Sequence, residues 1–215
     1  MKRHAHGFTM IEMAIVIVVI GLILGAVLIS GGSVFGRAGV ASLLSNIKDL
    51  ATASRDFKTR YSYFPGDLPN AGTYIALDAG TICNDGLSVP LMGNGIVDTL
   101  NESDCALEHL VKAGMLSKVD YDPITLKYFI TSSVGAGVRL SLWYDPDTKN
   151  NVVRISNLPC DVALEIDRKL DSATANTPFN QGSVLAATDQ SGTTLIQTCV
   201  SGSTNDPVPA LLVKY

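Results

Sequence analysis

The sequence predicts an α+β fold, in which a long N-terminal helix packs on a small antiparallel β-sheet. Three observations lead to this prediction. An apolar run lies near the N-terminus, a helical repeat of apolar residues follows it, and the second half of the chain holds short β-rich stretches separated by turn residues. A chain of 215 residues is long enough for one globular domain with an anchor, and too short for two full domains with one.

The apolar run, residues 13–29, is about as long as a helix that spans a membrane. It follows a short basic leader, MKRHAHG, and no small-residue cleavage site of the secretory type comes after it. Lys2 and Arg3 favour the cytoplasmic side, which would place the rest of the chain outside the inner membrane. A plain signal anchor is the alternative interpretation of these features.

One acidic residue, Glu12, stands at the start of the apolar run. A carboxylate buried near the middle of a bilayer costs roughly 2.5–3.5 kcal/mol, and less near the interface. Glu12 therefore needs a cationic partner, or it must extend to the membrane surface. The residues alone leave both alternatives open.

Several residues around this point resemble the processing signal of type IV pilins and type II secretion pseudopilins: Gly7, Phe8, Thr9, Ile11, Glu12 and the apolar run. The resemblance implies that a prepilin peptidase and methyltransferase cuts between Gly7 and Phe8 and methylates the new N-terminus of Phe8. It also implies that Glu12 pairs with the Phe8 amine of a neighbouring subunit and so sets the register of a filament. The expected fold is then type IV pilin-like.

The resemblance divides the chain into four parts. Residues 1–7 would form a leader peptide, residues 8–30 a transmembrane and filament-core helix, residues 31–60 its continuation, and residues 61–215 a periplasmic globular α+β domain. The protein would cross the bacterial inner membrane once before it enters a pilus or pseudopilus. Four glycines in residues 31–39 are expected to weaken the helix locally.

Beyond residue 39, apolar residues recur at three- and four-residue spacing, which predicts a helix with one face toward a core. The positions on this face are Val40, Leu43, Leu44, Ile47, Leu50, Ala51, Ser54, Phe57 and Tyr61. Turn residues in YSYFPGDLPNA, residues 61–71, should end this helix.

A second set of motifs resembles a recurring subset of bacterial prepilin-like proteins. The motifs are FPGDLPNA at residues 64–71, GNG at residues 93–95 and ESDCALEHLVKAGML at residues 102–116. Glu108 occupies the place where that subset has a tryptophan. Residues 103–114 should form a helix, and His109 is interpreted as structural, because one histidine cannot form a catalytic or metal-binding constellation alone.

Further elements are expected in the second half of the chain. Predicted strands cover residues 126–134, 138–144 and 152–156 as a meander, a short helix covers residues 161–170, and short strands cover residues 183–187, 193–198 and 210–213.

The four cysteines, Cys83, Cys105, Cys160 and Cys199, form no C-x-x-C pair, which argues against a zinc or thioredoxin-type site. An even number in an exported domain predicts two disulfides, for which three connectivities exist. We favour Cys83–Cys105 and Cys160–Cys199, because each would close a loop on one side of the sheet. The second pair would also hold the C-terminal region, as in many pilins.

Charge and motif content exclude some functions. The net charge is −4 and no basic block lies outside the N-terminus, so no nucleic-acid binding is expected. No catalytic or nucleotide-binding motif occurs, so the chain is not predicted to be an enzyme. No cofactor is expected other than a possible calcium ion. Oxygen ligands for calcium are conceivable in a glycine-rich acidic stretch, whose alternative interpretation is a solvated loop. The candidates are Asp85, Asn94 and Asp98, with Glu102 and Asp104 nearby.

The predicted function is that of a structural subunit of a type IV pilus or type II secretion pseudopilus, and of a minor subunit because the chain is longer than many major pilins. Its expected partners are the prepilin peptidase, other pilin or pseudopilin subunits and the inner membrane. The alternative is a pilus-associated binding module that captures DNA, a surface or a secreted substrate.

Overall fold

The computed structural model describes residues 10–78, 83, 92–135, 137–146, 149–171, 181–189, 194–196, 199 and 206–215, with only the backbone for residues 23–37. The chain forms two compact units, Met1–Ala38 and Gly39–Tyr215. The predicted domain boundaries at residues 7, 30 and 60 remain predictions.

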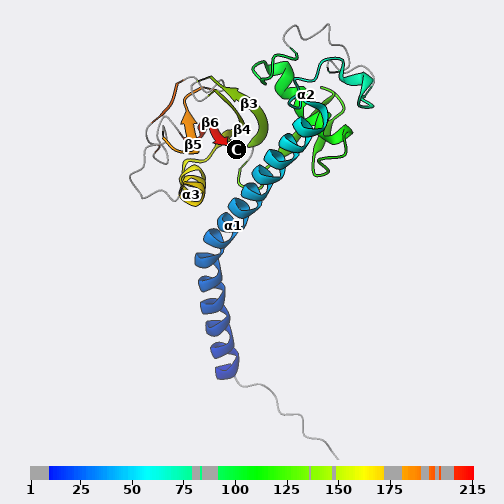
Figure 1. Ribbon diagram of the computed structural model, residues 1–215. Coiled ribbons are helices and arrows are strands. Elements are labelled where there is room, and N and C mark those ends of the chain that lie inside the picture. The colour runs from blue at the N-terminus through cyan, green and yellow to red at the C-terminus, as the bar shows by residue number, and fades with distance from the viewer. Residues whose placement is uncertain are drawn as a thin grey trace, which may run out of the picture. The chain divides into compact units, whose positions relative to one another are not determined.

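Helix α1, Met10–Tyr61, contributes to both units (Figure 1). The backbone of residues 31–39 is helical throughout, so the four glycines there do not interrupt the helix. The helix ends at the predicted turn, where Ser62 adopts the left-handed conformation with φ of 66°. Two basic residues, Lys58 and Arg60, lie in the last turn, where the negative end of the helix dipole favours positive charge.

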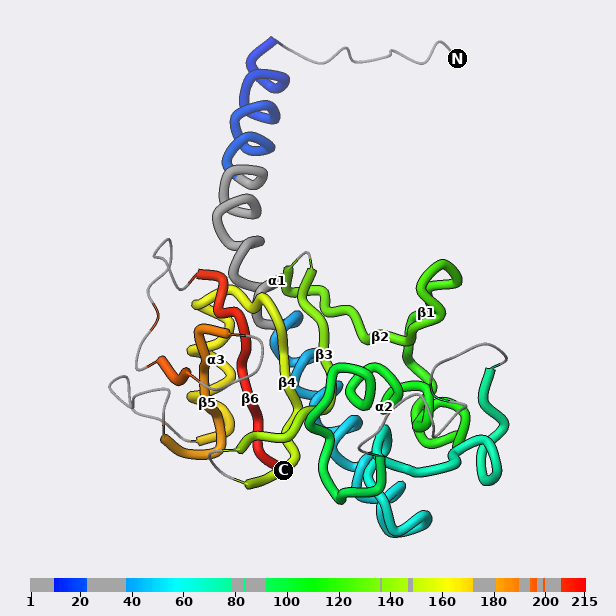
Figure 2. Tube along the Cα trace, turned by 90° about the horizontal axis from the view of Figure 1, so that it is seen from above, coloured from blue at the N-terminus to red at the C-terminus, as the bar shows by residue number. Residues whose placement is uncertain are grey.

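The remaining elements confirm the α+β class. The helices are η1 (Ala71–Thr73), α2 (Leu100–Lys112) and α3 (Cys160–Leu170), and the strands are β1 (Asp120–Asp122), β2 (Lys127–Thr131), β3 (Arg139–Asp145), β4 (Asn150–Leu158), β5 (Val184–Ala187) and β6 (Val208–Lys214). All strand pairs are antiparallel, in the order β1-β2-β3-β4-β6-β5 (Figure 2).

The core lies between one face of the sheet and the helices of the second unit. Leu142 of β3 pairs with Val153 of β4, and Ile155 of β4 pairs with Leu211 of β6; all four side chains are buried in this core. The predicted face of α1 packs there as well. Val40, Leu43, Ile47, Leu50, Ala51, Ser54 and Phe57 are buried, and Leu44 and Tyr61 are partly buried.

The opposite face of the sheet carries a smaller apolar cluster. Its members alternate in sequence with the residues of the main core, as the two-residue period of a strand requires. The cluster consists of Trp143, Val152, Leu185, Ala187, Ala210 and Leu212, with Leu195 packed against it.

Two sequence-based expectations about the strands were wrong in part, and one further strand was not predicted. The strand expected at residues 126–134 is shorter, because Leu126 has a φ of 57° and ends the extended conformation before Lys127. Strand β1, which pairs with β2, was not predicted. In the described part of residues 193–198, Leu195 forms only an isolated bridge with Ala187, so no strand is present there.

Helix α2 begins before the predicted residue 103, because Thr99 caps it. The Thr99 hydroxyl accepts a hydrogen bond from Glu102 N at 3.1 Å, and the Glu102 carboxylate accepts one from Thr99 N at 3.0 Å, which completes a capping box. At the other end, Gly114 has a φ of 72°, which suits a glycine just beyond a helix.

Replacing Thr99 by alanine should therefore destabilise the protein by about 1 kcal/mol, because an N-terminal N–H of α2 loses its acceptor. Chemical unfolding of the full chain, followed by the fluorescence of its one tryptophan, Trp143, would measure the effect. The exposed Thr59, whose hydroxyl donates to Arg55 O inside α1, supplies the matched control. Thr59→Ala should change the stability by less than about 0.5 kcal/mol. Equal effects of the two substitutions would contradict the role of the cap.

Candidate functional site

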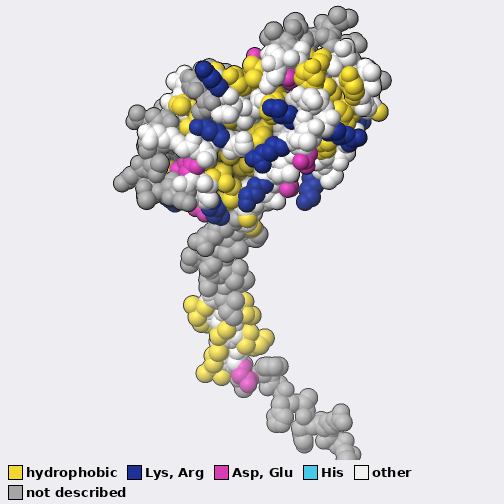
Figure 3. All heavy atoms as spheres, in the orientation of Figure 1, with side chains coloured by type: hydrophobic (Ala, Val, Ile, Leu, Met, Phe, Trp, Pro, Cys, Tyr) yellow, Lys and Arg dark blue, Asp and Glu magenta, His cyan; other side chains and the backbone are white. Residues whose placement is uncertain are grey.

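Apart from Glu12, the N-terminal part of α1 is apolar on all sides, and no other described residue covers its apolar side chains. Its large hydrophobic side chains are between 46% and 94% exposed. They are Met10, Ile11, Met13, Ile15, Val16, Ile17, Val18, Val19, Ile20 and Leu22. Figure 3 shows hydrophobic side chains covering the visible face of this segment. A helix that is hydrophobic all round is stable when lipid or other protein surrounds it, rather than water.

Glu12 lies in the first turn of this helix and is the acidic residue there. The partial positive charge at a helix N-terminus favours a carboxylate at this position. Gly7 and Phe8, between which cleavage is predicted, lie outside the described residues, so the structure shows neither the cleavage point nor the Phe8 amine.

The expected membrane span receives no direct structural support. Within the part of the chain that the structure describes, no helix is both long and apolar enough to cross a membrane. Part of the expected span, residues 8–30, falls outside the residues whose side chains are described.

The structure contains two disulfides, Cys83–Cys105 and Cys160–Cys199, which are the pairs favoured from the sequence. Their Cα atoms lie 5.5 and 5.8 Å apart. The first ties the segment around Cys83 to α2, and the second ties the start of α3 to Cys199, which precedes the C-terminal strand. Cross-links over separations of 22 and 39 residues contribute on the order of 3–4 kcal/mol each to stability.

The two short motifs before α2 are joined by one carboxylate. Asp67, from FPGDLPNA, accepts hydrogen bonds from the backbone of the GNG motif: from Asn94 N at 3.0 Å, from Gly95 N at 2.9 Å and from Gly93 N. Asp67 is fully buried, and burial raises its pKa although the three N–H groups oppose this shift. Sequence reasoning found both motifs, but it did not predict that one binds the other.

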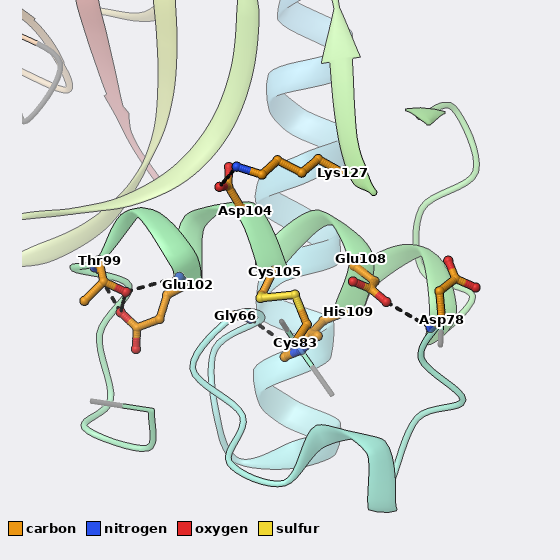
Figure 4. Close-up of a disulfide and its surroundings, with 10 residues drawn as sticks. All are labelled: Gly66, Asp78, Cys83, Thr99, Glu102, Asp104, Cys105, Glu108, His109 and Lys127. Atoms are coloured by element: carbon orange, nitrogen blue, oxygen red, sulfur yellow. Dashed lines mark hydrogen bonds and ion pairs between the residues drawn. A yellow bond between two sulfur atoms is a disulfide. The ribbon is translucent and has the colours of Figure 1, made fainter. Parts of the chain in front are cut away.

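His109 of α2 holds the same loop in place. Its Nδ1 accepts a hydrogen bond from Gly66 N at 2.9 Å (Figure 4). Its ring stacks on Phe57 of α1 with the centroids 5.9 Å apart. The side chain is fully buried, and burial lowers the pKa of His109 to about 4. A neutral imidazole with Nδ1 as acceptor therefore joins α1, α2 and the loop at Gly66.

Glu102 and Asp98 form a close pair of carboxyl groups at the start of α2. Glu102 Oε2 accepts hydrogen bonds from Asp98 N and Thr99 N, each at 3.0 Å. The other oxygen, Oε1, and Asp98 Oδ1 are buried without a hydrogen-bond donor. Burial, reinforced by the neighbouring Asp98 side chain, raises the pKa of Glu102 to about 7.

The calcium candidates that lie among the described residues are not gathered into a site. Asn94 Oδ1 accepts a hydrogen bond from Ile96 N within its own turn, and Asp104 pairs with Lys127 at 2.6 Å. Asp85 lies outside the described residues. No group of three histidine, cysteine, aspartate or glutamate side chains is placed to hold a metal ion among the residues described.

Glu108 of α2 has a structural contact of its own. It is 2% exposed, and its Oε1 accepts a hydrogen bond from Asp78 N at 3.0 Å. The glutamate thus connects α2 to the segment that precedes Cys83 (Figure 4).

The chain carries the N-terminal signal of type IV pilins and pseudopilins. Residues 2–28 match the family model described as the prokaryotic N-terminal methylation motif, which confirms the resemblance found from the residues around Gly7 and Glu12. No curated protein and no solved structure matches the chain. The motif points to a membrane-anchored structural protein rather than an enzyme, to processing by a prepilin peptidase and to assembly with other pilin subunits.

Proposed function

We propose that the chain is a minor structural subunit of a type IV pilus or of a type II secretion pseudopilus, assembled through its N-terminal helix. The match of residues 2–28 to the methylation motif carries this proposal. The exposed apolar surface of α1 supports it, because such a helix requires lipid before assembly and neighbouring helices afterwards.

The processing step follows from the same motif. The leader, residues 1–7, is removed between Gly7 and Phe8, and the α-amine of Phe8 is methylated. Residues 8–30 then anchor the subunit in the inner membrane by a single pass, residues 31–60 continue the helix, and residues 61–215 form the periplasmic domain. The two disulfides support an oxidising compartment for that domain.

Assembly depends on Glu12. Cleavage creates a cationic amine on Phe8, and a carboxylate in a low-dielectric surrounding is strongly stabilised by a cation at hydrogen-bond distance. When Glu12 of one subunit meets the Phe8 amine of the next, the contact is head-to-tail. A head-to-tail contact that does not close into a ring produces an open helical array, which is a filament.

Mass spectrometry of the protein from its native membrane tests the processing step. The expected chain begins at Phe8 and carries one additional methyl group. Gly7→Val should leave the leader attached, because it removes the glycine after which the cut is expected. A wild-type chain that still begins at Met1, or one trimmed beyond Ile29, would contradict the proposal.

Filament formation tests the role of Glu12. Glu12→Val should leave cleavage intact but abolish incorporation into filaments, measured as the subunit recovered in sheared filament fractions. Glu165→Val, on α3 in the second unit, removes a carboxylate from a position that the proposal does not use. Filaments that contain as much of the Glu12→Val subunit as of the Glu165→Val subunit would overturn the assembly mechanism.

A further inference from the structure

We propose that a polar groove on the second unit binds an acidic saccharide, a sugar chain that carries carboxylate groups. The groove has a volume of about 640 Å³, within the range of ligand sites. It lies between α2, the β1–β2 hairpin and one face of β3 and β4, and its chemistry comes from Asp104, Asp122, Lys127, Phe129, Arg139 and Arg154. Binding at this groove would add a ligand to the proposed filament subunit, and it does not depend on the filament role.

Two arginines on neighbouring strands form the cationic part of the groove. Arg139 of β3 pairs with Ser156 of β4, and Arg154 of β4 pairs with Ser141 of β3, so both arginines occupy the same face one pair apart. Such diagonal neighbours lie roughly 7–8 Å apart. Guanidinium groups offer planar sets of N–H donors that match a carboxylate with two hydrogen bonds.

Arg154 is held in place before any ligand arrives. It is 7% exposed, its Nε donates to Ser141 Oγ at 3.1 Å, and its guanidinium lies 4.5 Å from the centroid of the Trp143 ring. Burial lowers the pKa of Arg154, while the nearby carboxylate of Asp104 raises it. Arg154 thus places a fixed positive charge beside the groove, and the exposed Arg139 is the arginine that a ligand can contact.

The acidic residues of the groove favour a saccharide over an acidic peptide. Asp122 accepts hydrogen bonds from Ile124 N at 2.9 Å and Thr125 Oγ1 at 2.7 Å, and a carboxylate has room for further donors. Asp104 and Asp122 can accept hydrogen bonds from sugar hydroxyls, whereas the ionised side chains of an acidic peptide offer only acceptors. A uronic-acid saccharide brings both groups, a carboxylate for the arginines and hydroxyl donors for the aspartates.

The groove also offers an aromatic wall and a displaceable ion pair. Phe129 lines the groove, with the Arg139 guanidinium 5.0 Å from its ring centroid, so a sugar ring can pack on an apolar surface beside a cation. Lys127 reaches Asp104 on the side of α2 that faces away from Cys105 and His109 (Figure 4). Because exposed ion pairs contribute little to stability, a ligand can replace this contact at small cost.

Binding of trigalacturonate to the full-length chain in non-ionic detergent tests the proposal by calorimetry. We expect millimolar or tighter binding that weakens as salt is added, and at least tenfold weaker binding of a neutral galactose trisaccharide. Arg139→Gln should weaken binding about tenfold, because a charged hydrogen bond is lost. Arg168→Gln, at an exposed arginine of α3 outside the groove, is the matched control and should bind as the wild type does.

Three results would overturn the proposal. The first is no heat at millimolar trigalacturonate, and the second is equal affinity of the Arg139→Gln and Arg168→Gln variants. The third is binding of pentaglutamate as tightly as trigalacturonate, which would exclude the saccharide as the ligand. Asp122→Asn provides a second folded variant, in which binding should be weaker because a charged acceptor is lost, while the unfolding midpoint stays close to that of the wild type.

Discussion

Replacing Gly66 by alanine is expected to destabilise the protein by roughly 3–5 kcal/mol, a large part of the stability of a typical domain. Gly66 has a φ of 94°, and a Cβ at this position would overlap the carbonyl oxygen of Glu102 and lie 3.3 Å from Ala106 Cβ. The first contact is with backbone, so no side-chain rotation relieves it. The loop would have to move away from α2, which would also break the hydrogen bond from Gly66 N to His109 Nδ1.

Gly95 provides a control that separates the steric contact from the backbone conformation. Its φ is 90°, similar to that of Gly66, but a Cβ there would have no heavy atom within 4 Å. Gly95→Ala should therefore show the conformational cost alone, about 1–2 kcal/mol. Chemical unfolding of both variants, followed by Trp143 fluorescence, gives the comparison. If the two substitutions destabilise the protein equally, the close approach of loop and helix is not as described.

The pH dependence of stability should reveal two opposing buried groups, His109 and Glu102. The pKa of His109 is lowered from 6.5 to about 4 in the folded protein. The unfolded chain therefore binds the proton more readily, and stability falls as the pH is lowered from 6.5 toward 4. The pKa of Glu102 is raised from 4.5 to about 7, so the folded state binds the proton more readily. Its contribution is fully present below pH 4.5 and is lost as the pH rises toward 7.

Because the two windows overlap, the contributions of these groups should nearly cancel between pH 4.5 and 6.5 in the wild type. Glu102→Gln mimics the protonated carboxyl and leaves His109 as the titrating member of the pair. The free energy of unfolding should then rise by about 2–3 kcal/mol as the pH increases from 4.5 to 6.5. His109→Asn retains an acceptor for Gly66 N but does not titrate, which leaves Glu102 as the titrating member of the pair. The free energy of unfolding should then fall by a similar amount, about 2–3 kcal/mol, as the pH increases from 4.5 to 6.5.

The variant that carries both substitutions is the internal control for this experiment. Its stability should again be nearly independent of pH in this window, apart from the contributions of other groups that the wild type shares. Unfolding free energies of the four proteins, measured at intervals of pH, test the scheme. Slopes of the same sign in the two single variants would show that at least one of the buried groups is assigned the wrong protonation state.

The elements that sequence patterns predicted well are those with a local physical cause. The apolar face of α1 from Val40 to Tyr61 repeats at helical spacing, and its residues are buried or partly buried as expected. The short helix at residues 161–170 and strands β3 and β4 lie within a few residues of their predicted positions. The α+β class follows from these elements, because each depends mainly on neighbours in the sequence.

The pairing of two other predicted segments depends on contacts between distant residues. Residues 193–198 have the composition of a strand, yet in their described part only Leu195 bridges to Ala187. Strand β6 pairs with β4 on one side and with β5 on the other, so the C-terminal segment lies inside the sheet rather than at its edge. Strand propensity does not specify which partner a segment will have, because pairing depends on which faces remain uncovered.

The candidate sites divide in the same way. The processing signal and Glu12 were evident from the sequence, because peptidase recognition and membrane insertion act on a linear segment. The sequence also favoured one pairing of the four cysteines, because the preference depends on the loops that each disulfide would close.

Only the tertiary structure placed Asp67 against the GNG motif, and Arg139 and Arg154 at one groove. The members of each set come from different turns, loops or strands, and packing of α2 against the sheet and the preceding loop brings them together. Burial then changes their chemistry, since a carboxylate or guanidinium removed from water must find a partner in the fold.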